Sequence, residues 1–375
     1  MSLKKGEITI IKKNKFNDIL EWTKEICTKD IESGFAIDFD KKNNIILTGN
    51  YLGEKRYSSY LSKLDKNGND IWSKAFKNNK QNMIYDVIFD SKENIITTGF
   101  EGEWTNAPTP HVKACVKKYD KNGDILWEKT FQRGICTIGF SATTGPKDDI
   151  FVASTFFKPG EPTLGCLIVK YDKDGEVIWD KIYHEYHMDI PRKIQIDNKG
   201  NIVIVGYCYT PYKIKGKWME GALVLKYDKN GNLIWSNRYG KDLGMEALGA
   251  SIDSENNIIL SGRINFRKKM NPVVIKINEK GDINWLKTKK YNYNSLSYSI
   301  ALDSHDEPII GITSEPSKKV RDCIIKYSKN GNIKFISDSI VKRTIFDLKI
   351  DNDDSIIITG NTNDKKAYIA KIKNI

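Results

Sequence analysis

One ten-residue stretch recurs along the whole chain, and its clearest copy is Lys226-Tyr-Asp-Lys-Asn-Gly-Asn-Leu-Ile-Trp235. Most copies place a Gly between two short apolar runs and a Trp four residues after the Gly, a pattern typical of two strands joined by a tight turn. Asn-Gly and Asp-Gly tolerate the positive φ that a two-residue hairpin turn needs, and a neighbouring Asp can accept hydrogen bonds from backbone amides two residues on. The sequence therefore predicts a series of β-hairpins.

The copies are evenly spaced. The Gly and the aromatic residue that follows it recur as Gly68/Trp72, Gly123/Trp127, Gly175/Trp179, Gly231/Trp235, Gly281/Trp285 and Gly331/Phe335. A further copy that ends at Trp22 keeps the Trp but lacks the Gly. Successive aromatic positions lie 50, 55, 52, 56, 50 and 50 residues apart. A period near 50 residues is typical of propeller blades.

The order of elements in a complete repeat is strand a, a tight turn, a Gly-ended strand b, a variable loop, strand c, the Asn-Gly turn and the Trp-containing strand d. Residues 7–26 resemble the second half of a repeat, and residues 347–375 supply the first three strands of one. We therefore expect strand 18–26 to pair with strand 367–372, which removes the open sheet edges. The predicted fold class is all-β: a seven-bladed β-propeller of four-stranded antiparallel blades, closed by the N-terminal strand.

This organisation predicts a single domain over residues 1–375, although the length alone would allow two or three. The predicted blades cover residues 30–78, 79–132, 133–184, 185–240, 241–291, 292–340, and 341–375 together with 7–29.

Two charged positions also recur. Strand a ends in Asp40, Asp90, Asp197, Asp253, Asp303 and Asp351, which we interpret as carboxylates that fix the following turn. Strand c carries Lys63, Lys118, Lys170, Lys226, Lys276, Lys326 and Lys371. Because residues two apart share one face of a strand, we interpret each Lys as part of a surface ion pair of low energy, such as Lys226–Asp228. The third repeat departs from the pattern, with Ser141-Ala-Thr-Thr-Gly-Pro146 in place of the Asp turn.

The repeat resembles the SBBP-type β-propeller repeat. The resemblance rests on Asp197-Asn-Lys-Gly-Asn-Ile-Val-Ile-Val-Gly206 together with Leu225-Lys-Tyr-Asp-Lys-Asn-Gly-Asn-Leu-Ile-Trp235, and it extends over roughly residues 30–375. It implies a bacterial or archaeal origin and a scaffold without any particular activity, because such repeats specify architecture.

Composition excludes several classes of function. The formal charge is +12, but only 8 of the 60 basic residues are Arg, and the one basic run is Arg267-Lys268-Lys269, so we do not expect nucleic-acid binding. The six Cys lack metal-type spacing, and we interpret them as buried thiols. No apolar run approaches the roughly 18 residues of a membrane span, and the start lacks a signal-peptide pattern. We expect a cytoplasmic monomer, or a secreted or surface protein if a signal has been removed.

No metal or cofactor is expected. The four-residue Asp turns supply too few oxygen ligands for calcium. His184, His187 and His111 fall in loops without a recognised metal-binding spacing.

Loop length distinguishes the two faces of the predicted disc. The a–b and c–d turns are short, whereas the b–c and d–a connections on the other face include long loops at 101–111, 156–162, 207–220 and 264–270. Long loops on a rigid scaffold often carry recognition. We predict that ligand contact centres there, on aromatic and guanidinium side chains of the kind that dominate interfaces: Trp104, Trp218, Tyr209, Tyr212, Arg263 and Arg267.

The sequence leaves two functions open. The first is a non-enzymatic binding module whose long-loop face engages a protein or glycan. The second is a hydrolase or lyase that acts on a carbohydrate with carboxylates near the channel mouth, drawn from Glu101, Glu103, Glu161, Glu185 and Asp189. Two carboxylates about 5–10 Å apart in a cleft, one with a raised pKa, would favour the enzyme.

Overall fold

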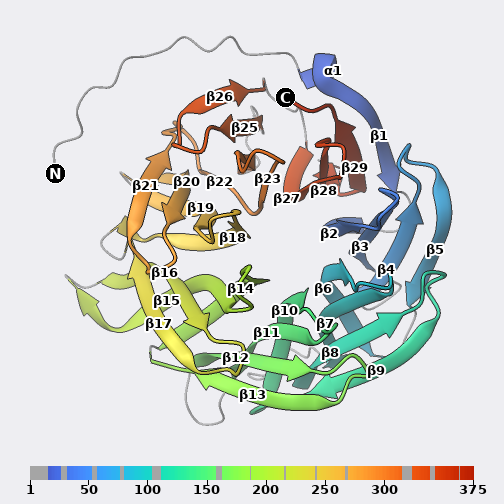
Figure 1. Ribbon diagram of the computed structural model, residues 1–375, viewed down its shortest axis with the longest axis horizontal. Helices are drawn as coiled ribbons and strands as arrows, with labels where there is room; N and C mark the ends of the chain where they lie inside the picture. Colours follow the sequence, from blue (N-terminus) through green and yellow to red (C-terminus); the bar gives the residue numbers. More distant parts are fainter. Residues whose placement is uncertain are drawn as a thin grey trace.

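The computed structural model describes residues 16–26, 32–52, 57–76, 80–103, 111–157, 163–185, 187–214, 217–240, 243–266, 269–314, 323–337, 343–362 and 364–375. Within these ranges the chain is almost entirely β-structure, with one short helix, α1 (Phe16–Ile19). Figure 1 shows small sheets arranged around a central axis, with the chain passing once around it from blue to red. The all-β prediction is confirmed.

Each repeat forms an antiparallel sheet, which we call a blade; it has four strands except at residues 295–336, where two short strands take the place of the first. The first three blades are β2 (Glu32–Phe39), β3 (Ile45–Leu52), β4 (Tyr57–Leu64) and β5 (Asp70–Phe76); β6 (Gln81–Phe89), β7 (Ile95–Glu103), β8 (His111–Tyr119) and β9 (Ile125–Phe131); and β10 (Cys136–Thr144), β11 (Ile150–Phe157), β12 (Leu164–Tyr171) and β13 (Val177–Tyr183).

The next blades are β14 (Met188–Ile196), β15 (Ile202–Ile214), β16 (Lys217–Tyr227) and β17 (Leu233–Tyr239); β18 (Glu246–Ile252), β19 (Ile258–Phe266), β20 (Lys269–Ile277) and β21 (Ile283–Thr288); and β22 (Ser295–Leu296), β23 (Ile300–Leu302), β24 (Pro308–Ser314), β25 (Cys323–Tyr327) and β26 (Ile333–Ile336). A single parallel pairing, Leu164 with Met188, joins the β10–β13 blade to the β14–β17 blade.

The last sheet combines the two ends of the chain, with strand order β1-β29-β28-β27. Its strands are β1 (Leu20–Ile26), β27 (Arg343–Ile350), β28 (Ile356–Thr362) and β29 (Ala367–Ile372). The predicted pairing is present: β1 runs antiparallel to β29, from Leu20 opposite Ile372 to Ile26 opposite Ala367. The N-terminal strand therefore covers the edge of β29 that would otherwise be open.

Both kinds of tight turn share one construction. Asp65 accepts the amides of Asn67 and Asn69, and Asp40 accepts the equivalent amides of Lys42 and Asn44. Three residues lie between the two residues whose backbones pair at the base of each turn, so the predicted two-residue turn is wrong. The third loop residue has positive φ, which is typical of a three-residue hairpin with a bulge.

A Trp ring explains why the c–d turn uses Gly at its positive-φ position. A Cβ on Gly123 would lie 2.8 Å from the Trp72 ring of the preceding blade, whereas the a–b turn accepts Asn43 at φ 61°. The Trp72 indole N–H also donates to the backbone oxygen of Lys121 at 3.3 Å. Each such Trp thus docks on the next blade, but the rings are only half-buried rather than largely buried, because strand d is the outermost strand.

The strand-c lysines other than the partly exposed Lys170 are buried in ion pairs, so the prediction of surface pairs is wrong. Each ammonium bonds the carboxylate at the a–b turn of its own blade, not the Asp two residues on. Among the described residues these pairs are Lys63–Asp40, Lys118–Asp90, Lys170–Asp149, Lys226–Asp197, Lys276–Asp253, Lys326–Asp303 and Lys371–Asp351, with N–O distances of 2.7 to 3.0 Å. In the third repeat, Asp149 from the end of the turn replaces the missing strand-a Asp.

The hydrophobic core lies between blades. One cluster joins Val205 and Val224 of the β14–β17 blade to Leu260 and Ile275 of the next. The predicted buried thiols are confirmed for Cys115, Cys136, Cys166, Cys208 and Cys323, while Cys27 lies outside the described residues. No helix in the described ranges is long and apolar enough to cross a lipid bilayer.

Deleting residues 1–26 should lower the melting temperature and the solubility, because it exposes the edge of β29. Deleting only residues 1–15, which leaves β1 in place, is the matched control and should change neither. Thermal melts by circular dichroism compare the two proteins. An unchanged melt after the longer deletion would show that β1 contributes nothing to the fold.

Replacing Lys226 by Ala should cost about 3–5 kcal/mol, because it leaves the carboxylate of Asp197 buried and unpaired. Lys199→Ala is the control, since Lys199 and its partner Glu279 are 57% and 41% exposed and solvent-exposed pairs contribute little to stability. Urea denaturation measures both. Equal costs for the two variants would contradict the role assigned to the buried pair.

Stability should fall as the pH drops below about 4. Burial opposes the charge of Asp40, but bonds from Asn44 and Lys63 outweigh it and hold its pKa below the ordinary value; Asp90, Asp197 and Asp303 behave alike. A lowered folded pKa gives stability that is present above the unfolded pKa and is lost as the pH falls through the folded one. Melting temperatures from pH 6 to 2 should show this decline, and Asp40→Asn should make it shallower.

Candidate functional site: the central channel

The innermost strand of most blades contains a β-bulge that directs one large side chain into a central cavity. The pairing register shifts across Phe35, Tyr85, Phe140, Arg192, Leu248 and Phe346. Tyr298, in the gap between β22 and β23, takes the same place. All seven line a cavity of about 520 Å³. We call these seven residues the collar.

The collar forms an almost continuous chain of ring contacts. Phe35 stacks on Phe346, with centroids 5.5 Å apart, and meets Tyr85 edge-on at 6.0 Å. Tyr85 and Phe140 lie 5.4 Å apart, as do Tyr298 and Phe346. The guanidinium carbon of Arg192 lies 5.0 Å from the centre of the Phe140 ring. These side chains are all partly exposed, so they are not core residues.

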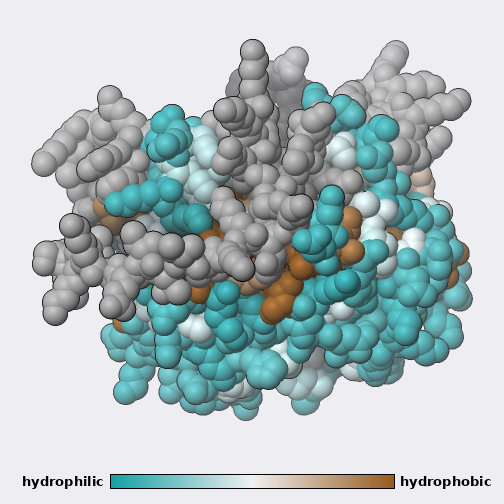
Figure 2. Space-filling model, turned by 90° about the horizontal axis from the view of Figure 1, so that it is seen from above, coloured by the Kyte–Doolittle hydropathy of each residue, from teal (hydrophilic) through white to brown (hydrophobic). Residues whose placement is uncertain are grey.

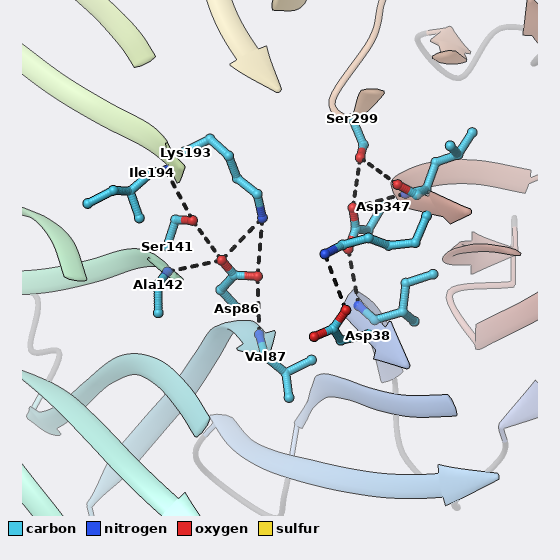
Figure 3. Close-up of polar contacts among 12 residues, drawn as sticks. Asp38, Asp86, Val87, Ser141, Ala142, Lys193, Ile194, Ser299 and Asp347 are labelled. Carbon is cyan, nitrogen blue, oxygen red and sulfur yellow. Dashed lines mark hydrogen bonds and ion pairs between the residues drawn. The ribbon is translucent and has the colours of Figure 1, made fainter. Parts of the chain in front are cut away.

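A polar row follows the collar by one position in five of the seven inner strands, the other two having Ala36 and Gly249 there. It includes Asp86, Ser141, Lys193, Ser299 and Asp347 (Figure 3). The row contains two similar clusters, one centred on each Asp, and each cluster connects three blades.

Asp86 is held by neighbouring blades on one side. Its carboxylate accepts the Ser141 hydroxyl at 2.7 Å and the Ala142 amide at 3.1 Å, and it pairs with the Lys193 ammonium at 3.1 Å (Figure 3). The carboxylate is buried, and its hydrogen bonds are made to the protein itself. Asp86 therefore fixes the spacing of β6, β10 and β14.

Asp347 makes the equivalent cluster on the other side. It accepts the Ser299 hydroxyl at 2.7 Å and the Ile37 amide at 3.1 Å (Figure 3). Burial raises the pKa of Asp347, and the nearby ammonium groups of Lys193 and Lys349 offset only part of the rise. Burial also opposes the charge of Lys349, but Asp38 and Asp347 outweigh it and raise the pKa of that ammonium.

The structure describes the side chains of two of the six predicted contact residues. Arg263 forms a salt bridge with Glu246 where β18 begins, and Tyr209 meets Tyr207 edge-on at 6.0 Å. Trp104 and Arg267 lie outside the described residues. Tyr212 and Trp218 fall on β15 and β16, in a part whose side chains are not described. Of the two described side chains, Arg263 is the one near the channel, because its charge acts on the collar residue Tyr298.

Two of the predicted long loops are mostly strand. The segment 207–220 continues β15 and β16 as a hairpin, with Lys213 opposite Trp218. The segment 264–270 likewise extends β19 and β20, with Phe266 opposite Lys269. In both segments the backbone pairing of the strands continues beyond the blade, because polar and apolar residues alternate well enough for an antiparallel ladder. The loop-like composition of these segments hides this alternation in the sequence.

The predicted carboxylates do not line the channel cavity. Asp189 is buried and accepts the amide of Glu185, while Glu161 lies outside the described residues. Glu103 is exposed at the end of β7. Glu101 lies near Cys115 and Glu128, whose carboxylate already pairs with Lys117 at 3.0 Å. Of the residues predicted as possible metal ligands, His184 packs its ring edge-on to Phe156 at 6.4 Å.

The sequence contained a signal for the collar that the repeat analysis missed. Each collar residue lies five positions before the first residue of the a–b turn, as Phe35 does before Asp40 and Arg192 before Asp197. A bulky residue inside a strand is ordinarily a core residue, so the pattern alone does not indicate that this position belongs to a site.

Comparison with known proteins supports the architecture. No protein-family model matches the chain. An uncharacterized WD repeat-containing protein of Acanthamoeba polyphaga mimivirus is 23% identical over 158 residues, which are 39% of this chain and only 11% of that protein. Virginiamycin B lyase of Staphylococcus aureus superposes with a TM-score of 0.60 and 12% identity over 94% of this chain and 99% of the lyase.

The WD40 domain of Neurospora crassa Pan2 gives a TM-score of 0.59 at 9% identity, covering 91% of this chain and 90% of that domain. The chain is a β-propeller. Extracellular domains 1-2 of Drosophila Semaphorin 1a also match, with a TM-score of 0.55 and 10% identity over 94% of this propeller and 88% of that chain. At such identities the likeness concerns the fold alone, because one fold serves many functions.

Proposed function

We propose that this propeller is a non-enzymatic binding scaffold that engages a protein or glycan at the mouth of its central channel. The observation that carries the proposal is the collar: seven bulged or gap-borne side chains, five of them aromatic, around a cavity of about 520 Å³. Ligand sites are typically cavities of roughly 300–1,000 Å³ with aromatic walls and a few polar groups. Core packing accounts for only part of the collar: Tyr85 and Phe140 contact a buried cluster of Phe100, Val112, Cys136 and Ile138, but all seven side chains are partly exposed to the cavity.

The predicted loop residues would extend this surface. The collar residues lie near the middle of the inner strands, as Phe35 does in Glu32–Phe39, and these strands begin at the face that bears the b–c and d–a connections. Tyr209, Tyr212, Trp218, Trp104, Arg263 and Arg267 belong to those connections or to the strand ends beside them. A ligand that enters the channel from this face would meet them first.

The alternative is a propeller hydrolase or lyase that acts on a carbohydrate. The observation in its favour is the raised pKa of Asp347 in a cavity that Asp86 also lines. A general acid needs a carboxyl group that is free to reach its substrate. Both carboxylates instead hold backbone amides and serine hydroxyls of neighbouring blades. This arrangement favours a structural role for the two acids and a binding function for the channel.

The finer architecture is part of the proposal: a single domain with seven blades in a closed ring of SBBP-type repeats, in a bacterial or archaeal protein. The sheet that pairs β1 with β29 supports the closure. Contacts between successive a–b turns also support it, since the Asn352 side chain donates to Asn43 at 2.7 Å across the two ends of the chain.

Truncating collar rings should abolish binding without unfolding the protein. We expect Phe35→Ala/Tyr298→Ala to lose ligands found by glycan-array and purified-protein screening, with a drop in melting temperature of only a few degrees, because both rings are partly exposed. The control is Ile125→Ala on the outermost strand β9, whose side chain is 53% exposed. Figure 2 shows another part of the edge of the disc, which is mainly hydrophilic with small hydrophobic patches.

The control variant should bind normally. Retained binding by the collar variant, with loss on Trp104→Ala and Trp218→Ala, would place the site on the loops alone. Loss of binding by Ile125→Ala would place it on the edge of the disc, and either result contradicts the channel as the binding site.

A further inference from the structure

We propose that the channel recognises an acidic sugar, whose carboxylate is bound by Arg192. This inference rests on the proposed binding function and specifies its ligand. Arg192 occupies a collar position that holds an aromatic or aliphatic residue in every other blade.

Arg192 differs from the other cations around the channel because its charge has no acidic partner. In the described part of the chain, its guanidinium has no salt bridge or hydrogen bond and contacts only the Phe140 ring. Lys193 pairs with Asp86 at 3.1 Å and Lys349 with Asp38 at 3.5 Å. A partly exposed guanidinium left without an anion at the wall of a cavity is available to a ligand.

The contact with Phe140 leaves the donor edges of Arg192 available. A guanidinium that lies against an aromatic ring is held by its cation–π attraction, while its N–H groups can still form two parallel bonds to a carboxylate. The chain shows this fork elsewhere, where the Nε and Nη2 groups of Arg263 each donate to a different carboxylate oxygen of Glu246. Arg192 is thus positioned and oriented to bind one carboxylate.

The charge balance favours a ligand with a single negative charge. Asp38, Asp86 and Asp347 offset the three cations Arg192, Lys193 and Lys349, so the channel as a whole is close to neutral. A polyanion would be repelled by three carboxylates, whereas one carboxylate can pair with Arg192 alone. The positive charge of Arg192 also acts on the collar residues Tyr85 and Tyr298. Burial raises the pKa of both hydroxyl groups, and the charge of Arg192 opposes this rise.

The other walls match the ring of a sugar. A sugar ring presents an apolar C–H face, which the negative faces of aromatic rings attract, and several hydroxyl groups at its edge. The hydroxyl of Tyr298 and the amide of Gln195 make no side-chain hydrogen bond in the described residues, and both line the cavity. A uronic acid combines a carboxylate with a sugar ring that can stack and with free hydroxyl groups. An acidic peptide side chain has the carboxylate but neither the sugar ring nor the hydroxyl groups.

Titration calorimetry on the full chain tests the inference with three probes: a trisaccharide that contains one uronic-acid residue, its methyl ester and a peptide with one carboxylate and the same net charge. Wild type should bind the acid about tenfold or more tightly than the ester, since a hydrogen-bonded charge contributes that much. Arg192→Gln should abolish this preference by weakening acid binding more than ester binding, and Arg192→Lys should restore part of it. Arg133→Gln, which removes an exposed surface pair, is the control and should behave as wild type.

The other possible results distinguish a failure of the carboxylate inference from a failure of the proposed binding function. If acid and ester bind equally in wild type and in Arg192→Gln, the carboxylate inference is wrong but the binding channel stands. If only the peptide binds, and does so through Arg192, the sugar is the wrong ligand class. If no sugar or peptide binds in a way that depends on the collar, the proposed function fails as well. Melting curves of Arg192→Gln establish that lost preference does not come from unfolding.

Discussion

The buried Lys–Asp pair is the interaction on which each blade depends. It joins the third strand of a blade to the turn between its first and second strands, as Lys226 does with Asp197 at 2.9 Å. The same carboxylate also accepts the amides of Lys199 and Asn201, so one side chain sets the turn and anchors strand c. Ion pairs at this depth cost desolvation energy and are retained where their geometry is fully satisfied. Here the pair fixes the register of the blade, since a shifted strand would separate the two charges.

The blades are joined by different interactions on the outside and the inside of the disc. Outside, the Trp ring of one blade covers the turn Gly of the next, which explains the Gly at Gly123 and Gly175. Inside, Asp86 and Asp347 accept amides and hydroxyls from adjoining inner strands. Between these layers lies apolar packing, which provides most of the stability but little specificity of alignment. The polar contacts therefore decide how the blades are oriented around the channel.

The side chains that line the channel are directed there by β-bulges in the inner strands. A regular strand would point alternate side chains toward the neighbouring sheets, whereas the bulge turns one additional residue toward the axis. Repetition of the bulge places Phe35, Tyr85 and Phe140 side by side although about fifty residues separate each from the next. The exception is Arg192, whose charge distinguishes one part of the collar from the rest. A site of this kind varies through single substitutions on a constant scaffold.

The sequence by itself determined the class of fold, the repeat order and the pairing of the two chain ends. These features depend on local turn chemistry and on a fixed period, both of which are visible in a single chain. It also located the turn carboxylates, such as Asp40, and the strand lysines, such as Lys63. It did not show that they pair, because the partner of a charge depends on strand neighbours rather than on sequence distance. For the same reason the sequence indicates the loop residues as a binding surface and does not indicate the collar.

Only the tertiary structure brought the collar together. Its members lie on separate inner strands, and their convergence depends on bulges and on the arrangement of the sheets around one axis, neither of which a residue pattern encodes. The cavity, the unpaired charge of Arg192 and the saturated bonds of Asp347 are likewise properties of distances between blades. The physical reason is that local propensity specifies elements, whereas sites are made where distant elements meet.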